Sequence, residues 1–315
     1  MGSSYLQALI DANQLPHFKQ LEAEAAYTLN ARNDSDITVT LPNHISMVTS
    51  RPVNGPAGHN WTQNTDPAEG QTLHSRRGAY VAGFFDVAHD AGRRTGLWAT
   101  KTKFSLFRGS YDAEHGAPDT IGENNGPNKL DVFVYEKSSP ALTRDFLALM
   151  NTNPCQASLL HFAEADSAGH STGWGSENYN KALMTLDACL GQIMELMATN
   201  PTLKGKSTLI VTADHGGKGK NHGDPVEPLD YTIPFFVWGA DVTPGDLYAW
   251  NMDTRRNPGT NRPAYTAPLQ PIRNSEVGNL LLSLLHLGPI PGSAINLRQD
   301  LRITRSISSV PVQTH

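Results

Sequence analysis

The chain has 315 residues and a mass of 34.2 kDa, with 38% hydrophobic residues, 17% charged residues and a formal net charge of -5. This composition is that of a globular protein with a substantial core, and it excludes a disordered or fibrous chain. The net charge is negative and basic residues form only scattered pairs, so the sequence predicts no basic surface that would bind long nucleic acid. No apolar run approaches the roughly 20 residues that a membrane span requires.

Two cysteines, Cys155 and Cys189, are too few for a disulfide scaffold, and neither stands in a Cys-x-x-Cys pair. One bridge between them and two separate thiols both fit the sequence. The first residues, MGSSYLQALIDANQ, lack the basic start and the apolar stretch of a secretory signal.

Apolar residues recur at helical spacing in several segments, which we expect to form amphipathic helices. In chain order the expected helices are 17–27, 80–91, 139–150 (with Ser139 as N-cap), 176–199 and 275–287. Short apolar runs that suit buried strands are 158–163, 207–213 and 233–239. Because strand, helix and strand alternate, the sequence predicts an α/β fold with a mainly parallel central sheet flanked by helices on both faces.

Two stretches, 105–131 and 241–272, are rich in Gly, Pro, Asn and Asp and show no period, so we expect them to form rim loops over a site. No repeat, low-complexity tract or sharp change of composition marks a linker. We therefore expect one domain over 1–302 and a loose tail over 303–315.

Potential metal ligands follow two of the expected strands, at the sheet edge where open parallel sheets bind ligands. The first strand leads into Asp166 and His170, four positions apart on a turn of small residues. The second leads into Asp214, His215 and two glycines, with His222 shortly after. Each segment alone is most simply a turn. Together, three His and two Asp supply the mixed nitrogen and oxygen ligands that zinc favours, and enough of them for two ions.

Thr40 is the candidate nucleophile, because it directly precedes a segment with helical character. A hydroxyl at a helix N-terminus can point toward an anion that the helix amides also attract. Taken alone, Thr40 is most simply an N-cap. Beside two metal ions its hydroxyl can be deprotonated, which a weak alcohol nucleophile requires at neutral pH.

Four motifs in one order resemble those of the nucleotide pyrophosphatase/phosphodiesterases, a branch of the alkaline phosphatase superfamily. They are Thr-Leu-Pro-Asn-His at 40–44, Asp166-x-x-x-His170, Asp214-His215-Gly216 and His222-Gly223. The resemblance covers nearly the whole chain. It implies an alkaline phosphatase-like fold and a site with two divalent ions, most simply Zn²⁺.

The resemblance also implies a role for each site residue. One ion is expected on Asp166, His170 and His222, and the other on Asp214, His215 and the Thr40 oxygen. Asn60 is expected to donate to phosphate oxygens, although its spacing from Thr40 is one residue off the family pattern. His44 is expected to be structural, and His161, within an apolar run, to be a buried neutral histidine.

One departure from the family concerns its first strand, which ends in Asp-Gly and supplies the remaining ligand of the second ion. Asp11 is no substitute, because LQALIDANQLP predicts a helix and its exit. We therefore expect a fold that lacks the first strand, in a truncated chain or a degenerate family member.

The function that the resemblance implies is metal-dependent hydrolysis of phosphate esters through a phospho-threonine, by a phosphodiesterase, nucleotide pyrophosphatase or phosphatase. The expected partner is a small phosphate ester or a nucleotide. The alternative is a catalytically impaired or non-catalytic metal- or phosphate-binding member. A calcineurin-like metallophosphatase, suggested by Asn-His-Gly-Asp at 221–224, fails for want of its Asp-x-His and Gly-His-x-His segments. Family members are usually exported, which implies a periplasmic or secreted full-length form.

Overall fold

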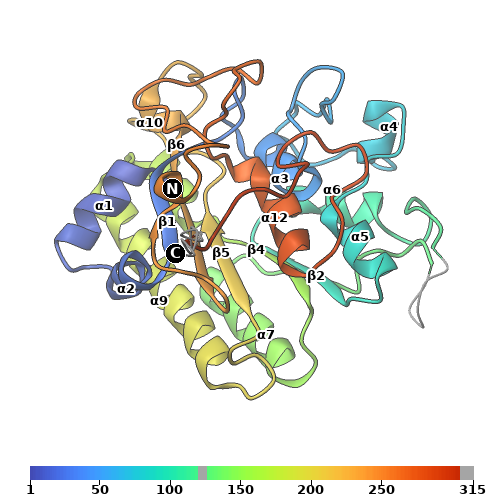
Figure 1. Ribbon diagram of the computed structural model, residues 1–315, viewed down its shortest axis with the longest axis horizontal. Helices are drawn as coiled ribbons and strands as arrows, with labels where there is room; N and C mark the ends of the chain where they lie inside the picture. The colour runs from blue at the N-terminus through green and yellow to red at the C-terminus, as the bar shows by residue number, and fades with distance from the viewer. Residues whose placement is uncertain (120–125, 306–315) are drawn as a thin grey trace, which may run out of the picture.

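The computed structural model describes residues 1–119 and 126–305, and in them the strands lie between two groups of helices (Figure 1). A three-stranded sheet has the order β3-β2-β4, and a four-stranded sheet has the order β5-β6-β1-β7. The strands are β1 (Ala26–Arg32), β2 (Thr95–Ala99), β3 (Val132–Tyr135), β4 (Ala157–His161), β5 (Thr208–Thr212), β6 (Thr232–Gly239) and β7 (Gly245–Asp246).

The three-stranded sheet is parallel throughout, which confirms the predicted α/β class. In the four-stranded sheet, β6 runs antiparallel to both β1 and β5, and only β7 runs parallel to β1. Strand β6 follows β5 without a long crossover helix, and parallel neighbours need such a crossover. The prediction of mainly parallel pairing therefore holds for the first sheet and not for β6.

Helices pack on both sides of the strands, with one group on the left and below and the other on the right in Figure 1. The first group is α1 (Ser3–Asp11), α2 (Pro16–Glu24), α7 (Ser139–Thr152) and α9 (Glu177–Thr199). The second is α3 (Thr40–Thr49), α4 (Leu73–Arg77), α5 (Phe84–Asp90), α6 (Ser105–Ser110) and α12 (Val277–Leu284). Short helices α8 (Glu164–Thr172), α10 (Pro228–Tyr231) and α11 (Leu247–Trp250) complete the α-helices of the described residues.

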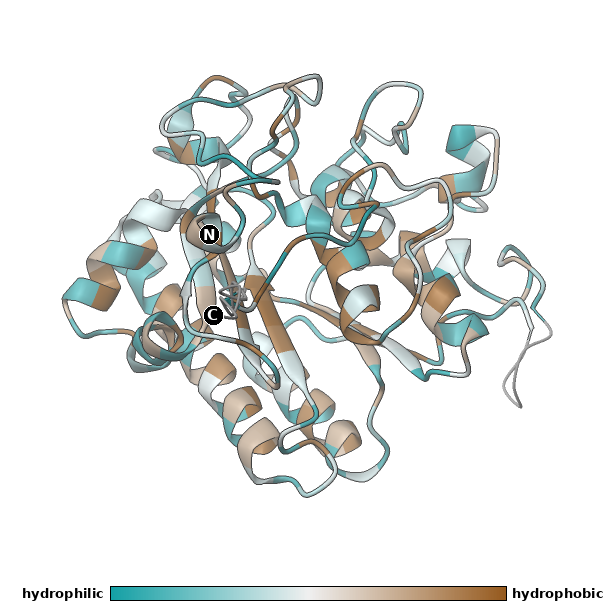
Figure 2. Ribbon diagram, viewed as in Figure 1, coloured by the Kyte–Doolittle hydropathy of each residue, from teal (hydrophilic) through white to brown (hydrophobic). Residues whose placement is uncertain are grey.

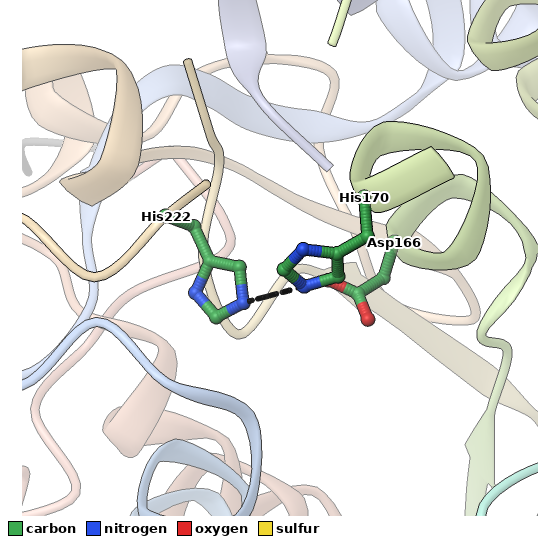
Figure 3. Close-up of side chains that lie close together, drawn as sticks. All are labelled: Asp166, His170 and His222. Atoms are coloured by element: carbon green, nitrogen blue, oxygen red, sulfur yellow. Dashed lines mark hydrogen bonds and ion pairs between the residues drawn. The ribbon is translucent and has the colours of Figure 1, made fainter. Parts of the chain in front are cut away.

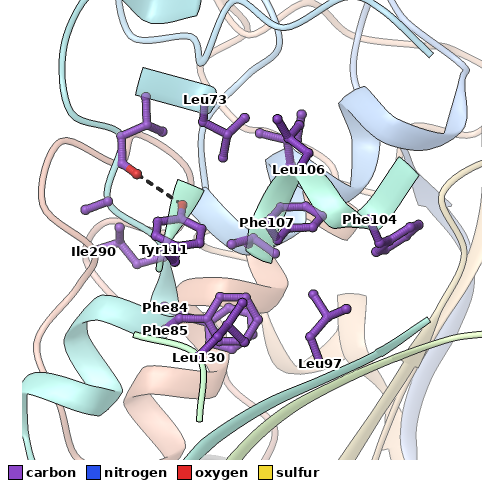
Figure 4. Close-up of a cluster of buried hydrophobic side chains, with 14 of the residues drawn as sticks. Leu73, Phe84, Phe85, Leu97, Phe104, Leu106, Phe107, Tyr111, Leu130 and Ile290 are labelled. Carbon is purple, nitrogen blue, oxygen red and sulfur yellow. Dashed lines mark hydrogen bonds between the residues drawn. The ribbon is translucent and has the colours of Figure 1, made fainter. Parts of the chain in front are cut away.

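The largest hydrophobic cluster packs α3, α5, α6 and α12 against β2, and it is rich in aromatic side chains (Figure 4). Phe84, Phe85, Phe104 and Phe107 are each at most 1% exposed. Full burial of such a side chain contributes about 1.5–3 kcal/mol before entropy is counted. Tyr111 is equally buried and donates its hydroxyl to Val81 O (3.0 Å), so its one polar atom is satisfied. Figure 2 shows the hydrophobic colour concentrated on the central strands and the inner faces of the helices.

Several predicted boundaries were wrong, and the reason is tertiary pairing. The helix expected over 17–27 ends at Glu24, because Ala26 already pairs with Val237 of β6. The helix expected over 80–91 begins only at Phe84. Strands β1, β2 and β3 were not predicted.

At α7 the side chain that caps the helix is Ser138, which accepts from Ala141 N; Ser139 is the first helical residue and not the cap. The helix expected over 275–287 begins with a 3-10 turn at Asn274–Glu276 and ends at Leu284.

The predicted rim loops contain short elements of their own. The stretch 105–131 begins with α6, and its residues 120–125 lie outside the described residues. The stretch 241–272 contains β7 and α11. Residue Ile303 at the start of the expected tail is buried, and 306–315 lie outside the described residues. The single domain over 1–302 stays a prediction.

No helix among residues 1–119 and 126–305 is both long and apolar enough to cross a membrane. Both cysteines are free thiols buried in the protein, so the alternative of a bridge between Cys155 and Cys189 is not realised.

Candidate metal centre and active site

Asp166 and His170 lie on helix α8, which begins three residues after β4 ends. The small-residue turn predicted here is therefore a helix, and the spacing of four places both side chains on one face. Its small residues have a packing role, because a methyl group on Gly169 would lie 2.6 Å from the Trp174 ring. Helix α8 can approach Trp174 this closely only because position 169 carries no side chain.

The glycines after Asp214 and His215 allow the loop to fold closely, as predicted. A methyl group on Gly216 would lie 1.9 Å from Leu229 O, and one on Gly217 would lie 2.2 Å from the indole ring of a neighbouring tryptophan. This tight path returns the chain so that the His222 ring stacks on His215, with centroids 3.6 Å apart and planes at 10°.

The centre of the site is Asp166 Oδ1, which three imidazoles surround. It lies 3.5 Å from His170 Nε2, 3.6 Å from His215 Nε2 and 3.7 Å from His222 Nε2. Figure 3 shows Asp166, His170 and His222 pointing toward one another from α8 and the facing loop. Their ligand atoms all lie within 4.8 Å of one another. Asp166 Oδ1 is buried and has no hydrogen-bond partner, so the donor set fits a divalent cation.

Backbone carbonyls hold all three imidazoles in one tautomer. Each Nδ1 lies next to a carbonyl oxygen: His170 at Lys220 O (3.0 Å), His215 at Gly216 O (2.9 Å) and His222 at Thr38 O (2.7 Å). Because a carbonyl only accepts, Nδ1 carries the proton, and the Nε2 lone pair faces Asp166. Such outer contacts are what orient histidines that bind metals.

The protonation states also suit metal binding. Burial lowers the pKa of His215 to about 3, and it lowers the pKa of His222. Both rings are therefore neutral at pH 7. Burial alone would raise the pKa of Asp166, but His215 and the Lys101 ammonium outweigh it and lower that pKa on balance. Lys101 Nζ lies 2.6 Å from Asp166 Oδ2.

Thr40 is the first residue of α3 and not its N-cap, which is Val39. Its hydroxyl makes no capping bond, is almost fully buried and lies 3.3 Å from His215 Nε2. Asp214 Oδ2 lies 3.2 Å from the same nitrogen. We call Thr40, Asp214 and His215 the Thr40 half of the centre, and Asp166, His170 and His222 the Asp166 half.

Two flanking histidines lie where the sequence analysis placed them. His44 Nδ1 lies 2.9 Å from Thr40 O, to which it donates, and 3.7 Å from Asp214 Oδ2, so it braces the start of α3. His161 is buried beside Thr100 Oγ1 (3.2 Å), and burial holds its pKa well below the usual value.

Asn60 lies outside this cluster. With its amide nitrogen donating to Gly55 O (3.2 Å), its oxygen accepts from Arg77 Nη1 (2.5 Å). Its role on phosphate stays a prediction. The asparagine that reaches the start of α3 is Asn64, whose Oδ1 accepts from Leu41 N (2.9 Å), next to the candidate nucleophile. The spacing from Thr40 favoured Asn60, and only the path of the loop shows that Asn64 lies at the start of α3.

Lys101 was also missed. It stands directly beyond the carboxyl end of β2. Recognising 95–99 as a strand would have placed Lys101 at the same sheet edge as the predicted ligands.

A second group of potential ligands among the described residues is His89, Asp90 and Asp119. The fully buried Lys129 ammonium lies 2.7 Å from Asp90 Oδ1 and 3.2 Å from Asp119 Oδ2. A lysine thus already supplies the cation there.

Comparison with curated proteins finds relatives whose names refer to reactions of phosphate esters. GPI ethanolamine phosphate transferase 1 of Neurospora crassa is 25% identical over 179 residues, which are 52% of this chain and 17% of that protein. Venom phosphodiesterase of Naja atra is 26% identical over 211 residues, which are 61% of this chain and 25% of that protein. The chain spans a quarter or less of the length of these relatives.

Solved structures of similar fold cover nearly the whole chain. Murine ectonucleotide pyrophosphatase/phosphodiesterase 5 is 15% identical with a TM-score of 0.62, over 96% of this chain and 97% of that one. The alkaline phosphatase PafA is 12% identical with a TM-score of 0.64, over 93% of this chain and 95% of that one. These similarities confirm the predicted alkaline phosphatase-like fold. The family model for type I phosphodiesterase / nucleotide pyrophosphatase matches residues 1–266, and the chain belongs to that family.

Proposed function

We propose that the protein hydrolyses phosphate esters of small molecules or nucleotides, with Thr40 as the nucleophile. The observation that carries the proposal is the position of the Thr40 hydroxyl. It is buried at the N-terminus of α3, 3.3 Å from Nε2 of His215, which is one of the three imidazoles around Asp166. A helix N-terminus favours the negative charge of a phosphate at this point.

We infer that the centre holds two divalent ions, with zinc as the best match to its mixed imidazole and carboxylate ligands. The Asp166 half would hold one ion through its buried, unpartnered carboxylate oxygen and two imidazole nitrogens. The Thr40 half would hold the other. When bound, the ions supply charge that offsets the phosphate and lowers the pKa of the threonine hydroxyl.

The chain's own residues then perform a two-step transfer. Thr40 Oγ1 gives its proton to water and forms a bond to phosphorus as the bond from phosphorus to the leaving oxygen breaks. The leaving alkoxide takes up a proton from water and is released as the alcohol. Water then attacks the phospho-threonine, restores the hydroxyl and releases the second product. His44 holds the backbone of Thr40 in place during both steps, through its bond to Thr40 O.

The relatives support this choice of nucleophile and substrate. A threonine-to-alanine variant of murine ectonucleotide pyrophosphatase/phosphodiesterase 5 is inactive and has been solved in complex with AMP. The name of venom phosphodiesterase of Naja atra refers to phosphodiesters, which are one class of phosphate ester.

The test is hydrolysis of bis(4-nitrophenyl) phosphate by the zinc-loaded protein and by two variants at the nucleophile. Thr40→Ala is expected to lower turnover about a thousandfold, because no hydroxyl remains to attack. Thr40→Ser is expected to keep part of the activity. Bound zinc, measured by mass spectrometry, is expected to stay within about twofold, since Thr40 is not in the Asp166 half.

Two outcomes would contradict the proposal. Unchanged turnover in Thr40→Ala would show that water attacks the substrate directly. If the protein binds zinc and hydrolyses no diester, monoester or phosphonate, the non-catalytic binding protein is the correct alternative.

A further inference from the structure

Two fully buried asparagines, Asn43 and Asn274, lie where the start of α3 meets the residues after β5. Asn43 belongs to the Thr-Leu-Pro-Asn-His motif and lies in the first turns of α3, and Asn274 opens the 3-10 turn ahead of α12. The transfer described above uses neither of them. Asparagine is a poor residue inside a helix, because its side chain competes with the helix for backbone partners. The place of Asn43 in α3 is therefore explained by what its side chain holds.

The Asn43 amide holds the loop that leads into α3. Its Nδ2 donates to Ile37 O and to Val39 O, each at 3.0 Å, and its Oδ1 accepts from Asp34 N at 3.0 Å. A carbonyl only accepts and a backbone N–H only donates, so these partners fix which way the amide points. The carbonyls on both sides of position 38 are thereby held in place.

This loop reaches both halves of the metal centre. The carbonyl of Thr38, between the two that Asn43 holds, accepts from His222 Nδ1 at 2.7 Å. Thr40 follows as the first residue of α3. Along one short segment of backbone, Asn43 thus orients the His222 ring in the Asp166 half and the candidate nucleophile in the other half.

The Asn274 amide ties this loop to the segment that carries Asp214. Its Nδ2 lies 3.1 Å from Ala213 O, 3.4 Å from Asp214 O and 3.4 Å from Asn43 Oδ1, so its N–H groups are shared among these acceptors. The first two oxygens belong to the backbone directly after β5. Asn274 therefore sets the position of Asp214 relative to the amide of Asn43.

We propose that Asn43 and Asn274 form one amide clamp that positions Thr40 for attack on phosphorus. The amide clamp sets the place of Thr40 relative to Asp214 and His222, and it does so through backbone groups and not by contact with a substrate. The proposal rests on the proposed function, in which Thr40 is the nucleophile. Misplacement of a reacting group by about 1 Å can lower a rate about a hundredfold, so this indirect support has a measurable effect on turnover.

Asn279 on α12 is the matched control, because it has the same chemistry and burial without a link to the metal centre. It is fully buried, its Nδ2 donates to Ser293 Oγ (3.0 Å) and Ile295 O (2.7 Å), and its Oδ1 accepts from Ile290 N (2.8 Å). These partners lie after α12 and are not candidate ligands. Truncation of Asn279 therefore measures what the loss of a buried amide costs in stability alone.

The first test uses the metal-free protein and follows exchange of the imidazole Nδ1–H protons with solvent by NMR. In Asn43→Ala the Thr38 carbonyl loses its support, so exchange at His222 relative to His215 is expected to become about tenfold faster. His215 donates to a carbonyl outside the amide clamp, and global opening exposes both rings, so the ratio corrects for lost stability. Asn279→Ala is expected to leave the ratio unchanged. Metal and substrate are absent, so this outcome is independent of the proposed function.

The second test is turnover of bis(4-nitrophenyl) phosphate by the zinc-loaded protein. Asn274→Ala is expected to lower kcat about thirtyfold or more with KM within about threefold, because the hydroxyl and not the bound substrate is misplaced. Asn279→Ala is expected to lower Tm by a similar amount while keeping kcat within about twofold.

An unchanged exchange ratio in Asn43→Ala would overturn the proposal, and so would a kcat of Asn274→Ala equal to that of Asn279→Ala. If Asn43→Ala does not fold, Asn274→Ala takes its place in the exchange measurement. A ratio raised about threefold would then support the amide clamp, and an unchanged ratio would overturn it. If the unchanged protein hydrolyses no ester, the proposed function fails, and the exchange ratio alone decides whether the amide clamp holds the centre together.

Discussion

The Asp166 half of the metal centre takes its ligands from α8 and the loop that ends at His222, whereas the Thr40 half takes them from the start of α3 and the residues directly after β5. The first set closes to within 4.8 Å around a buried carboxylate oxygen. In the second, His215 Nε2 lies between Thr40, Asp214 and the oxygen of the other half.

The packing around the two halves differs. Gly169 allows α8, which carries Asp166 and His170, to pack directly on Trp174, whose ring also lies near His170 and His222. In the Thr40 half, His44 Nδ1 lies next to Thr40 O and Asp214 Oδ2 instead. Because the two sets of side chains have different supports, we expect the two halves to differ in metal affinity.

Replacement of Asp166 is expected to give the largest difference in zinc affinity between the two halves. Asp166→Asn is expected to weaken binding of the first zinc ion about a hundredfold or more, because the buried anion that faces three imidazoles is lost. Asp145→Asn, an exposed change on α7, is the matched control and is expected to leave the affinity unchanged. Zinc titration against a competing chelator measures both, and equal affinities would contradict the assignment of the Asp166 half.

A substitution in the other half sharpens the comparison. Asp214→Asn keeps the oxygen that accepts from His215 N and removes the charge. It is expected to change the affinity of the first zinc ion by less than about threefold while weakening the second site about tenfold. The same chelator titration reads both steps. A large loss at the first site would show that the halves are not separable.

A smaller effect is expected at a histidine that is buried but is not a candidate metal ligand. His59 lies outside both halves, bonded to Ser46 Oγ, and burial lowers its pKa to about 3. Below the ordinary pKa of about 6.5, His59 binds a proton in the unfolded chain but not in the folded chain. The free energy of unfolding therefore decreases as pH falls from about 6.5 toward 3. His59→Asn is expected to flatten the dependence of Tm on pH in this window.

The matched control for this change is His286→Asn at an exposed position. It is expected to leave the dependence of Tm on pH unaltered. If both substitutions flatten the dependence of Tm on pH equally, burial of His59 is not its cause.

How far the sequence predicts this molecule depends on how local each signal is. The grouping of the candidate ligands was predictable because Asp166 and Asp214 each follow an apolar run closely. Strand β2 could not be predicted, since five residues with a glycine carry no clear period and its burial comes from distant helices. Helix α8 was taken for a turn because its helix propensity is low, and packing on Trp174 overrides that propensity.

Site residues that depend on loop paths were the least predictable. The count from Thr40 favours Asn60, and only the folded loop shows that Asn64 contacts the start of α3. Lys101 became recognisable only when its strand was known. The role of Asn60 and the cellular location stay predictions.

The central claim is that the Asp166 half binds a divalent ion. Zinc stoichiometry tests it most directly, measured by calorimetry on the protein and on its Asp166→Asn variant. The account predicts at least about one tightly bound ion in the unchanged protein and about one ion fewer in Asp166→Asn. The same number of tightly bound ions in both proteins, or none in the unchanged protein, would contradict it.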